Sequence, residues 1–163
     1  MKTEVIIIIL ATIVIALCGL YLHYENTKLQ VSNYKIVNNN VPVDFNNYKI
    51  VQISDFHNNQ SDTLTNDLIK EIEKQKPNII VLTGDLIDSR KTNVEVAINF
   101  IKKINNVAPI YYVSGNHEAR IKSYRKNKEQ LAESKVVVLE NKTEVLKINE
   151  SSINLIGIDD PKM

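Results

Sequence analysis

An unbroken apolar run lies close to the N-terminus of the chain. Residues 5–22 read VIIIILATIVIALCGLYL, which is 18 residues without a charge. At 1.5 Å per residue, a helix of that length spans about 27 Å, close to the thickness of the hydrocarbon core of a bilayer. Lys2 precedes the run, and Tyr21 and Tyr24 lie where amphipathic rings meet the membrane interface. We therefore expect residues 1–24 to form an uncleaved signal anchor.

The flanks of this run bear on its orientation and on two alternative explanations. The positive charge of Lys2 and of the α-amino group favours a cytoplasmic N-terminus, which places the globular part outside the cytoplasm. A cleaved signal peptide is the first alternative, but the run is longer than a usual signal core and no clear cleavage site follows it. Lipid modification of Cys18 is the second, and Leu17 before it disfavours that reaction. The predicted localisation is therefore a single-pass membrane protein.

After the anchor, the pattern changes to short apolar runs that alternate with helical periodicity. Residues 25–47 are polar, and an alternating stretch over 29–37 predicts a tether that contains a first strand. From residue 49 onward, apolar runs recur about every 30 residues, which is the length of a strand–helix–strand unit. These runs cover residues 49–54, 79–83, 110–114 and 136–139.

The segments between and after these runs predict the remaining elements. Apolar residues at helical spacing, together with capping residues, predict helices over 61–77, 92–104 and 123–133. Residues 143–148 and 153–158 predict a hairpin. Strands that alternate with helices form a mostly parallel sheet with helices on its faces. The predicted fold class is therefore α/β, preceded by a transmembrane helix.

Composition and charge exclude several classes of function. The chain of 163 residues carries 20 Lys+Arg and 19 Asp+Glu, and 44% of its residues are hydrophobic. A net charge of +1, with the lysines spread among acidic residues, argues against a dedicated nucleic-acid binder. A single cysteine can form neither a disulfide framework nor a cysteine-based zinc site within this chain.

Polar residues follow each of the first three apolar runs. They are Asp55 and His57 after the first run, Gly84, Asp85 and Asp88 after the second, and Gly115, Asn116, His117 and Glu118 after the third. In an open α/β sheet, ligands bind outside the carboxyl ends of the strands. Oxygen and nitrogen donors without thiolate suit Mn²⁺, Fe or Zn²⁺. Each residue alone can be a helix cap, but the three groups together indicate a divalent-metal site.

These motifs resemble those of the calcineurin-like metallophosphoesterases. The family has the order DxH, GDxxD and GNH followed by an acidic residue. In this chain residues 55–57 read DFH, residues 84–88 read GDLID and residues 115–118 read GNHE. The strings QISDFHNN and VLTGDLIDSR, together with the apolar N-terminus, look most like the membrane-associated bacterial branch. The resemblance covers about residues 49–161 and implies a β-sheet flanked by helices.

The resemblance implies which residues would bind metal. Asp55 and His57 would hold one ion, Asp85 would bridge two ions, and Asn116 would ligate the second through its side-chain carbonyl. The complete family site holds two divalent ions, for which Mn, Fe and Zn are the candidates. A bridging carboxylate would offset the repulsion between two cations about 3.5–4 Å apart.

The resemblance also implies roles for three residues beside the metal. His117 would protonate or stabilise the leaving oxygen, and Asp88 would fix the orientation of His117. Arg90 is a candidate for phosphate binding, although related phosphatases often carry Arg directly after the second Asp and in this chain Ser89 intervenes. Asp88 and Glu118 keep a second interpretation, because acidic side chains also stabilise helix N-termini.

The family completes its site with further histidines, including a GHxH motif near the C-terminus, and the printed sequence lacks them. We therefore interpret residues 48–163 as the first half of the phosphoesterase fold. We expect it to bind one metal weakly, to hydrolyse phosphate esters poorly by itself, and to have a complementary C-terminal half as its partner. The membrane anchor favours a lipid-linked phosphate ester as substrate.

Two other classes of function stay open at this point. The first is a non-catalytic, membrane-anchored binding or regulatory module that has kept a degenerate phosphoesterase fold. The second is a signalling receiver, in which aspartates also gather at strand ends, and the GNHE motif and the apolar N-terminus argue against it.

Overall fold

A computed structural model describes residues 2–162, except for the side chains of residues 2, 26 and 27. By its internal contacts the chain divides into two compact units, Met1–Asn33 and Tyr34–Met163. The boundary between them falls within the polar segment that follows the apolar run.

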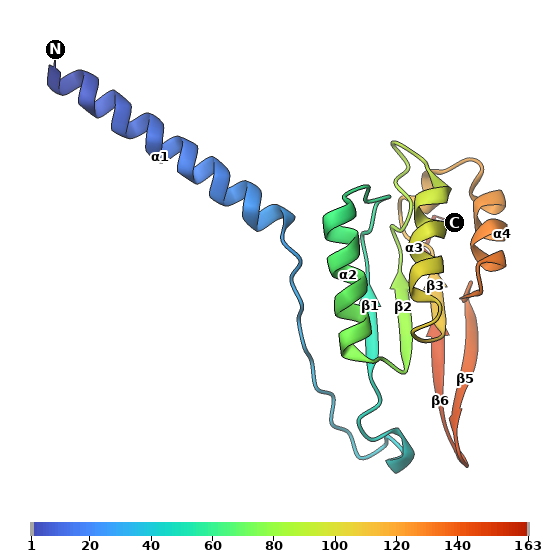
Figure 1. Ribbon diagram of the computed structural model, residues 1–163. Helices are drawn as coiled ribbons and strands as arrows, with labels where there is room; N and C mark the ends of the chain where they lie inside the picture. The colour runs from blue at the N-terminus through green and yellow to red at the C-terminus, as the bar shows by residue number, and fades with distance from the viewer. Residues whose placement is uncertain (1, 163) are drawn as a thin grey trace. The chain divides into compact units, whose positions relative to one another are not determined.

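The first unit is dominated by helix α1 (Lys2–Thr27), the blue helix of Figure 1. Its stretch Thr3–Glu25 has a mean hydropathy of 3.0 and none of it is buried. The helix is therefore long and apolar enough to span a membrane, as the sequence predicts. A signal sequence near the N-terminus would have the same length and composition. The orientation of the helix stays a prediction.

The segment after α1 differs from the prediction. None of residues 28–42 is in a strand, although the alternation over 29–37 predicts one. Tyr34 and Ile36 are 89% and 87% exposed. Alternating side chains are not sufficient for a strand, because its backbone N–H and C=O groups also need a neighbouring strand. The short 3-10 helix η1 (Val43–Phe45) follows, and it buries Phe45.

The second unit contains a four-stranded parallel sheet. Its strands are β1 (Ile50–Ile53), β2 (Ile79–Thr83), β3 (Ile110–Val113) and β4 (Val136–Val138). They lie in the order β1-β2-β3-β4, which is also their order along the chain. All four carboxyl ends therefore meet at one edge of the sheet, and the loops after β1, β2 and β3 are neighbours.

Three helices connect these strands, as the sequence predicts. They are α2 (Asp62–Gln75), α3 (Val94–Ile104) and α4 (Tyr124–Glu133), visible beside the sheet in Figure 1. The Ser61 hydroxyl accepts a hydrogen bond of 3.3 Å from the Leu64 N–H and so caps α2. Lys76, in the left-handed conformation with a φ of 48°, ends that helix directly before Pro77.

The sheet is covered on both faces, because side chains alternate along each strand. Ile80 and Leu82 of β2 pack with the helices in the larger core. Ile79 and Val81 of the same strand belong to a second core with the hairpin of β5 (Lys142–Ile148) and β6 (Ser151–Gly157). The predicted α/β class and the hairpin are confirmed. That the second half of the fold is missing stays a prediction.

Candidate metal centre

The loop after β1 runs beside the loop after β2 and is hydrogen-bonded to it. The Asp55 N–H donates to the Gly84 carbonyl at 3.2 Å, and the His57 N–H donates to the Asp85 carbonyl at 2.9 Å. These backbone bonds continue beyond the end of the sheet and bring two of the sequence motifs into contact. The relative position of these motifs is therefore fixed by the backbone before any side chain is considered.

Four non-glycine residues in these loops have a strained backbone, and Asn58, with a φ of 52°, is one of them. Asp55, His57 and Asp85 have φ angles of 57°, 47° and 53°, in the left-handed region that side chains disfavour. Such conformations cost of order 1–3 kcal/mol each and persist only where surrounding contacts hold them. Left-handed residues of this kind cluster at functional sites, where the strain aims side chains in a required direction.

Two glycines let the loops after β2 and β3 approach one another. A Cβ atom on Gly84, which has a φ of 94°, would lie 2.7 Å from the Gly115 Cα atom. A Cβ atom on Gly115 would lie 2.5 Å from the Asp85 nitrogen. Both distances are shorter than real Cβ contacts allow, so each motif needs its glycine for the close packing of the two loops.

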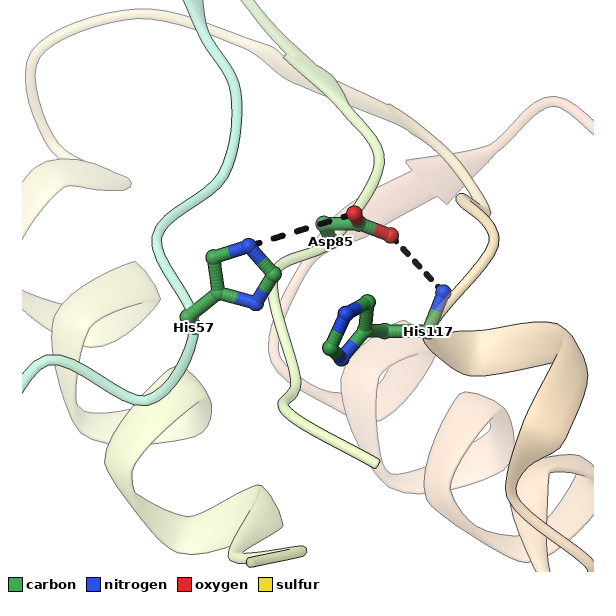
Figure 2. Close-up of side chains that lie close together, drawn as sticks. All are labelled: His57, Asp85 and His117. Carbon is green, nitrogen blue, oxygen red and sulfur yellow. Dashed lines mark hydrogen bonds and ion pairs between the residues drawn. The ribbon is translucent and has the colours of Figure 1, made fainter. Parts of the chain in front are cut away.

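His57, Asp85 and His117 converge at this edge, one from each loop (Figure 2). Each offers one ligand atom, and these atoms lie within 4.8 Å of one another. His57 Nε2 lies 3.9 Å from Asp85 Oδ2, and the His117 N–H donates to Asp85 Oδ1 at 2.9 Å. The two imidazole rings meet edge to face, with 4.5 Å between their centroids. The Asp85 carboxylate thus contacts both residues, His57 at its ring and His117 at its backbone N–H.

Asp55 and Asn116 lie at the border of this cluster. Asp55 Oδ1 is 3.6 Å from His57 Nε2, and the Asp55 side chain is 66% exposed. Asn116 Nδ2 donates a hydrogen bond of 3.1 Å to Asp85 Oδ2. Asn116 therefore presents its NH₂ group to Asp85, and metal ligation through its carbonyl oxygen requires rotation of the amide. The four ligands that the resemblance implies form one contiguous group, and their roles stay predictions.

The segment that follows Asp85 contacts the imidazole ring of His117. Its Nδ1 atom accepts a hydrogen bond of 3.2 Å from the Ser89 N–H, and the Ser89 hydroxyl oxygen and Asp88 Oδ1 each lie 3.2 Å from the same atom. Asp88 lies well before α3, which begins at Val94, so its carboxylate does not serve that helix N-terminus. The sequence did not identify the contact of Ser89, because only the fold brings residue 89 to residue 117.

Asp88 also binds Arg90. The Arg90 N–H and Nε–H donate to Asp88 Oδ1 at 2.8 and 3.0 Å, and Nη2 donates to Oδ2 at 2.7 Å. These bonds, with the positive charge of Arg90, hold the pKa of Asp88 well below its ordinary value. Asp88 is therefore an anion at neutral pH. The Arg90 side chain is 77% exposed and keeps further N–H donors besides the two bonded to Asp88.

Glu118 is the first residue of the short 3-10 helix η2 (Glu118–Arg120), but its carboxylate binds the neighbouring loops. Its side chain is fully buried, and its carboxylate accepts hydrogen bonds from backbone N–H groups in the loops after β2 and β3. The position directly after GNH was the only sequence feature that pointed to it. The three bonds themselves depend largely on residues about 30 positions away in the chain and could not be found from the pattern.

The donors of this cluster fit a divalent metal ion. Two imidazoles, carboxylates and an amide, without sulfur, are the ligands of Mn²⁺, Fe and Zn²⁺ sites. His57 Nδ1 is buried and has no hydrogen-bond partner among the described residues. A buried ring nitrogen without a partner is unfavourable, and a ligand at Nδ1 itself would remove that cost, whereas a metal ion on Nε2 would not. The residues present therefore fit the metal that the motifs indicate.

Comparison with known proteins assigns the family. The sequence profile described as "Calcineurin-like phosphoesterase" matches residues 48–158, which is more than half of the chain and includes all three motifs. The chain therefore belongs to the calcineurin-like phosphoesterase family. Members of this family use divalent metals, in agreement with the cluster of His57, Asp85 and His117.

Individual relatives agree with this assignment. The uncharacterized metallophosphoesterase YkoQ of Bacillus subtilis is 29% identical over 115 residues, covering 68% of this chain and 43% of YkoQ. A transmembrane protein with metallophosphoesterase domain from Bos taurus is 27% identical over 90 residues, covering 54% of this chain and 20% of that protein.

A solved structure, phosphopantetheinyl hydrolase (PptH) from Mycobacterium tuberculosis, matches with a TM-score of 0.48 and 15% identity, covering 67% of this chain and 41% of PptH. The chain spans less than half the length of each of these three proteins.

Proposed function

We propose that this chain is the metal-binding part of a membrane-anchored phosphoesterase that hydrolyses phosphate monoesters or diesters. The observation that carries the proposal is the convergence of His57, Asp85 and His117, each from a different strand end, within 4.8 Å. Family membership supplies the reaction class, and α1 supplies the membrane attachment.

The proposed ligands follow the family pattern. Asp55 and His57 would hold one ion, Asp85 would contribute to both ions, and Asn116 would ligate the second ion once its amide has rotated. When bound, two divalent ions would neutralise phosphate oxygens and lower the pKa of a water between them. Mn, Fe and Zn are all compatible with these donors.

The proposed catalytic residues lie on the other side of Asp85. We assign to His117 the donation of a proton to the leaving-group oxygen, and to Asp88, whose Oδ1 lies 3.2 Å from Nδ1, the orientation of the imidazole. Arg90, held by Asp88, can direct its remaining donors toward a phosphate oxygen. Arg90 thus contacts Asp88, Asp88 contacts the imidazole of His117, and the backbone N–H of His117 contacts Asp85.

We propose further that this length of chain binds one ion weakly and has little activity by itself. With His117 assigned as the acid and not as a ligand, the described residues offer the second ion only Asp85 and the neutral Asn116, and they offer the first ion Asp55, His57 and Asp85. A complementary C-terminal half would be the partner that supplies the remaining ligands. A lipid-linked phosphate ester is the proposed substrate, because α1 would keep the site near a bilayer.

The test is a metal-binding and hydrolysis assay on the full chain purified in detergent. With Mn²⁺ added, we expect about one ion per chain and slow hydrolysis of an activated phosphodiester, both lost in Asp85→Asn. The matched control is Asp67→Asn, an aspartate of α2 whose side chain is 53% exposed and pairs with Lys70. Absence of bound metal in the wild type would refute the proposal and favour a non-catalytic module.

A further inference from the structure

Glu118 is a fully buried carboxylate that the proposed mechanism does not use. It lies directly after His117 and begins the short 3-10 helix η2 (Glu118–Arg120). Burial of an ionised carboxylate is very unfavourable unless its oxygens are hydrogen-bonded. Its presence in this position therefore calls for specific partners.

The partners of Glu118 are three backbone N–H groups from two loops. Oε2 accepts from Asp85 at 2.9 Å and from Gly115 at 2.8 Å, and Oε1 accepts from Ile87 at 2.8 Å. Hydrogen bonds from N–H groups to a carboxylate are short and strong. Glu118 therefore joins the loop after β2 to the loop after β3.

The bonds of Glu118 act on Asp85, one of the residues with a strained backbone. Asp85 has a φ of 53°, and without an opposing force its backbone would relax toward the ordinary region. The bond from its N–H to Glu118 opposes that relaxation on one side, and the bond from the His57 N–H to its carbonyl opposes it on the other. The direction of the Asp85 carboxylate depends on both.

Two buried tyrosines lie beside Glu118. Tyr112, 1% exposed, and Tyr124, 6% exposed, share a hydrogen bond of 3.2 Å between their hydroxyls. Burial, and after it the nearby charge of Glu118, raise the pKa of the Tyr112 phenol, so it stays neutral.

We propose that Glu118 is a positioning residue of the metal centre, which holds Asp85 and the backbone before His117 at the separation that metal binding needs. It contacts no metal itself. This inference rests on the proposed function, since it assigns a second layer of support to the same site.

The first test is Glu118→Gln in the full chain in detergent. Glutamine keeps the size but replaces one acceptor oxygen with an NH₂ group, which then opposes a backbone N–H. Loss of a group that supports metal ligands typically weakens affinity about 10- to 100-fold. We expect that loss for Mn²⁺ measured by the electron paramagnetic resonance of the free ion.

The second measurement needs no metal. In the metal-free wild type, the amides of Asp85, Ile87 and Gly115 should exchange with deuterium as slowly as amides of the core strands, and in Glu118→Gln they should exchange faster. Leu131→Ala, at a fully buried site of α4, is the control for lost stability. It should lower the melting temperature yet keep the Mn²⁺ affinity and the slow exchange of the three amides.

Distinct outcomes would overturn the inference. If Glu118→Gln melts earlier, as Leu131→Ala does, but binds Mn²⁺ like the wild type, Glu118 is only structural. If Glu118→Gln does not fold, fast exchange of the three amides in the wild type would refute the inference by itself. If the wild type binds no Mn²⁺, the proposed function fails, whereas the exchange measurement still tests the joint.

Discussion

Replacement of Gly115 by alanine should displace the loop after β2 and weaken metal binding. The added Cβ would overlap Asp85 Oδ1 and lie 2.5 Å from the Asp85 nitrogen and 3.0 Å from the Gly84 Cα. Ordinary van der Waals contact begins at 3.4 Å, so Asp85 must move by roughly 0.9 Å. Sites of this kind tolerate about 0.5 Å of misplacement. The Asp85 carboxylate would therefore leave the position in which it contacts both His57 and His117.

The expected magnitude follows from that displacement. Overpacking of this kind typically costs about 1–3 kcal/mol of stability, so the variant should still fold while its melting temperature falls. We expect the Mn²⁺ affinity to fall at least about tenfold, which corresponds to ~1.4 kcal/mol. Both quantities are measurable on the full chain in detergent, by thermal unfolding monitored with circular dichroism and by Mn²⁺ titration.

The control uses another glycine of the chain. Gly19 in α1 has nothing within 4 Å of the position of an added Cβ, so Gly19→Ala should change neither quantity. A Gly115→Ala variant with the affinity and melting temperature of the wild type would contradict the close packing of the two loops. The glycines of the GD and GN motifs would then have no steric role at the metal centre.

Three further predictions concern other parts of the chain. Because the folded-state pKa of Asp88 is depressed, its carboxylate stabilises the fold above the ordinary aspartate pKa of about 4, and this contribution is lost as the pH falls toward the folded-state value. The difference in melting temperature between the wild type and Asp88→Asn should therefore shrink between about pH 5 and pH 2, and a constant difference would contradict this cause. Ser61→Ala should lose about 1 kcal/mol in chemical unfolding, because it removes the cap of α2, whereas Ser123→Ala, whose side chain makes no cap bond in α4, should lose less. The full chain should stay in the membrane pellet after alkaline carbonate extraction, and deletion of residues 2–24 should release it. Retention of the shortened chain would argue against α1 as the anchor.

The elements that the sequence predicts correctly are those whose pattern is local. β2 reads IIVLT and is mostly buried, and a continuous apolar run of this kind predicts a strand that is covered on both faces. The helix caps and the spacing of the runs then give the α/β order. The stretch over 29–37 has an equally regular alternation but no strand, because pairing depends on a neighbour that the pattern does not contain.

The candidate site divides in the same way. Asp55, Asp85 and Asn116 follow strands, and the parallel order of the strands brings them to one edge, which the sequence predicts. The orientation of the Asn116 amide, the contact of Ser89 with His117 and the bonds of Glu118 depend on side-chain positions across loops. These are set by packing between distant segments, and spacing alone carries no information about them.

The agreement between chain order and strand order has a consequence for how the site is made. Every residue assigned to the metal centre lies between residues 55 and 118, in the loops after three consecutive strands that are neighbours in the sheet in the same order. Contacts between nearby segments form faster than contacts between distant ones. As the polypeptide leaves the ribosome, each new strand can add to an edge already in place. We therefore expect the ligand cluster to assemble during synthesis, before the hairpin of β5 and β6 closes over the opposite face.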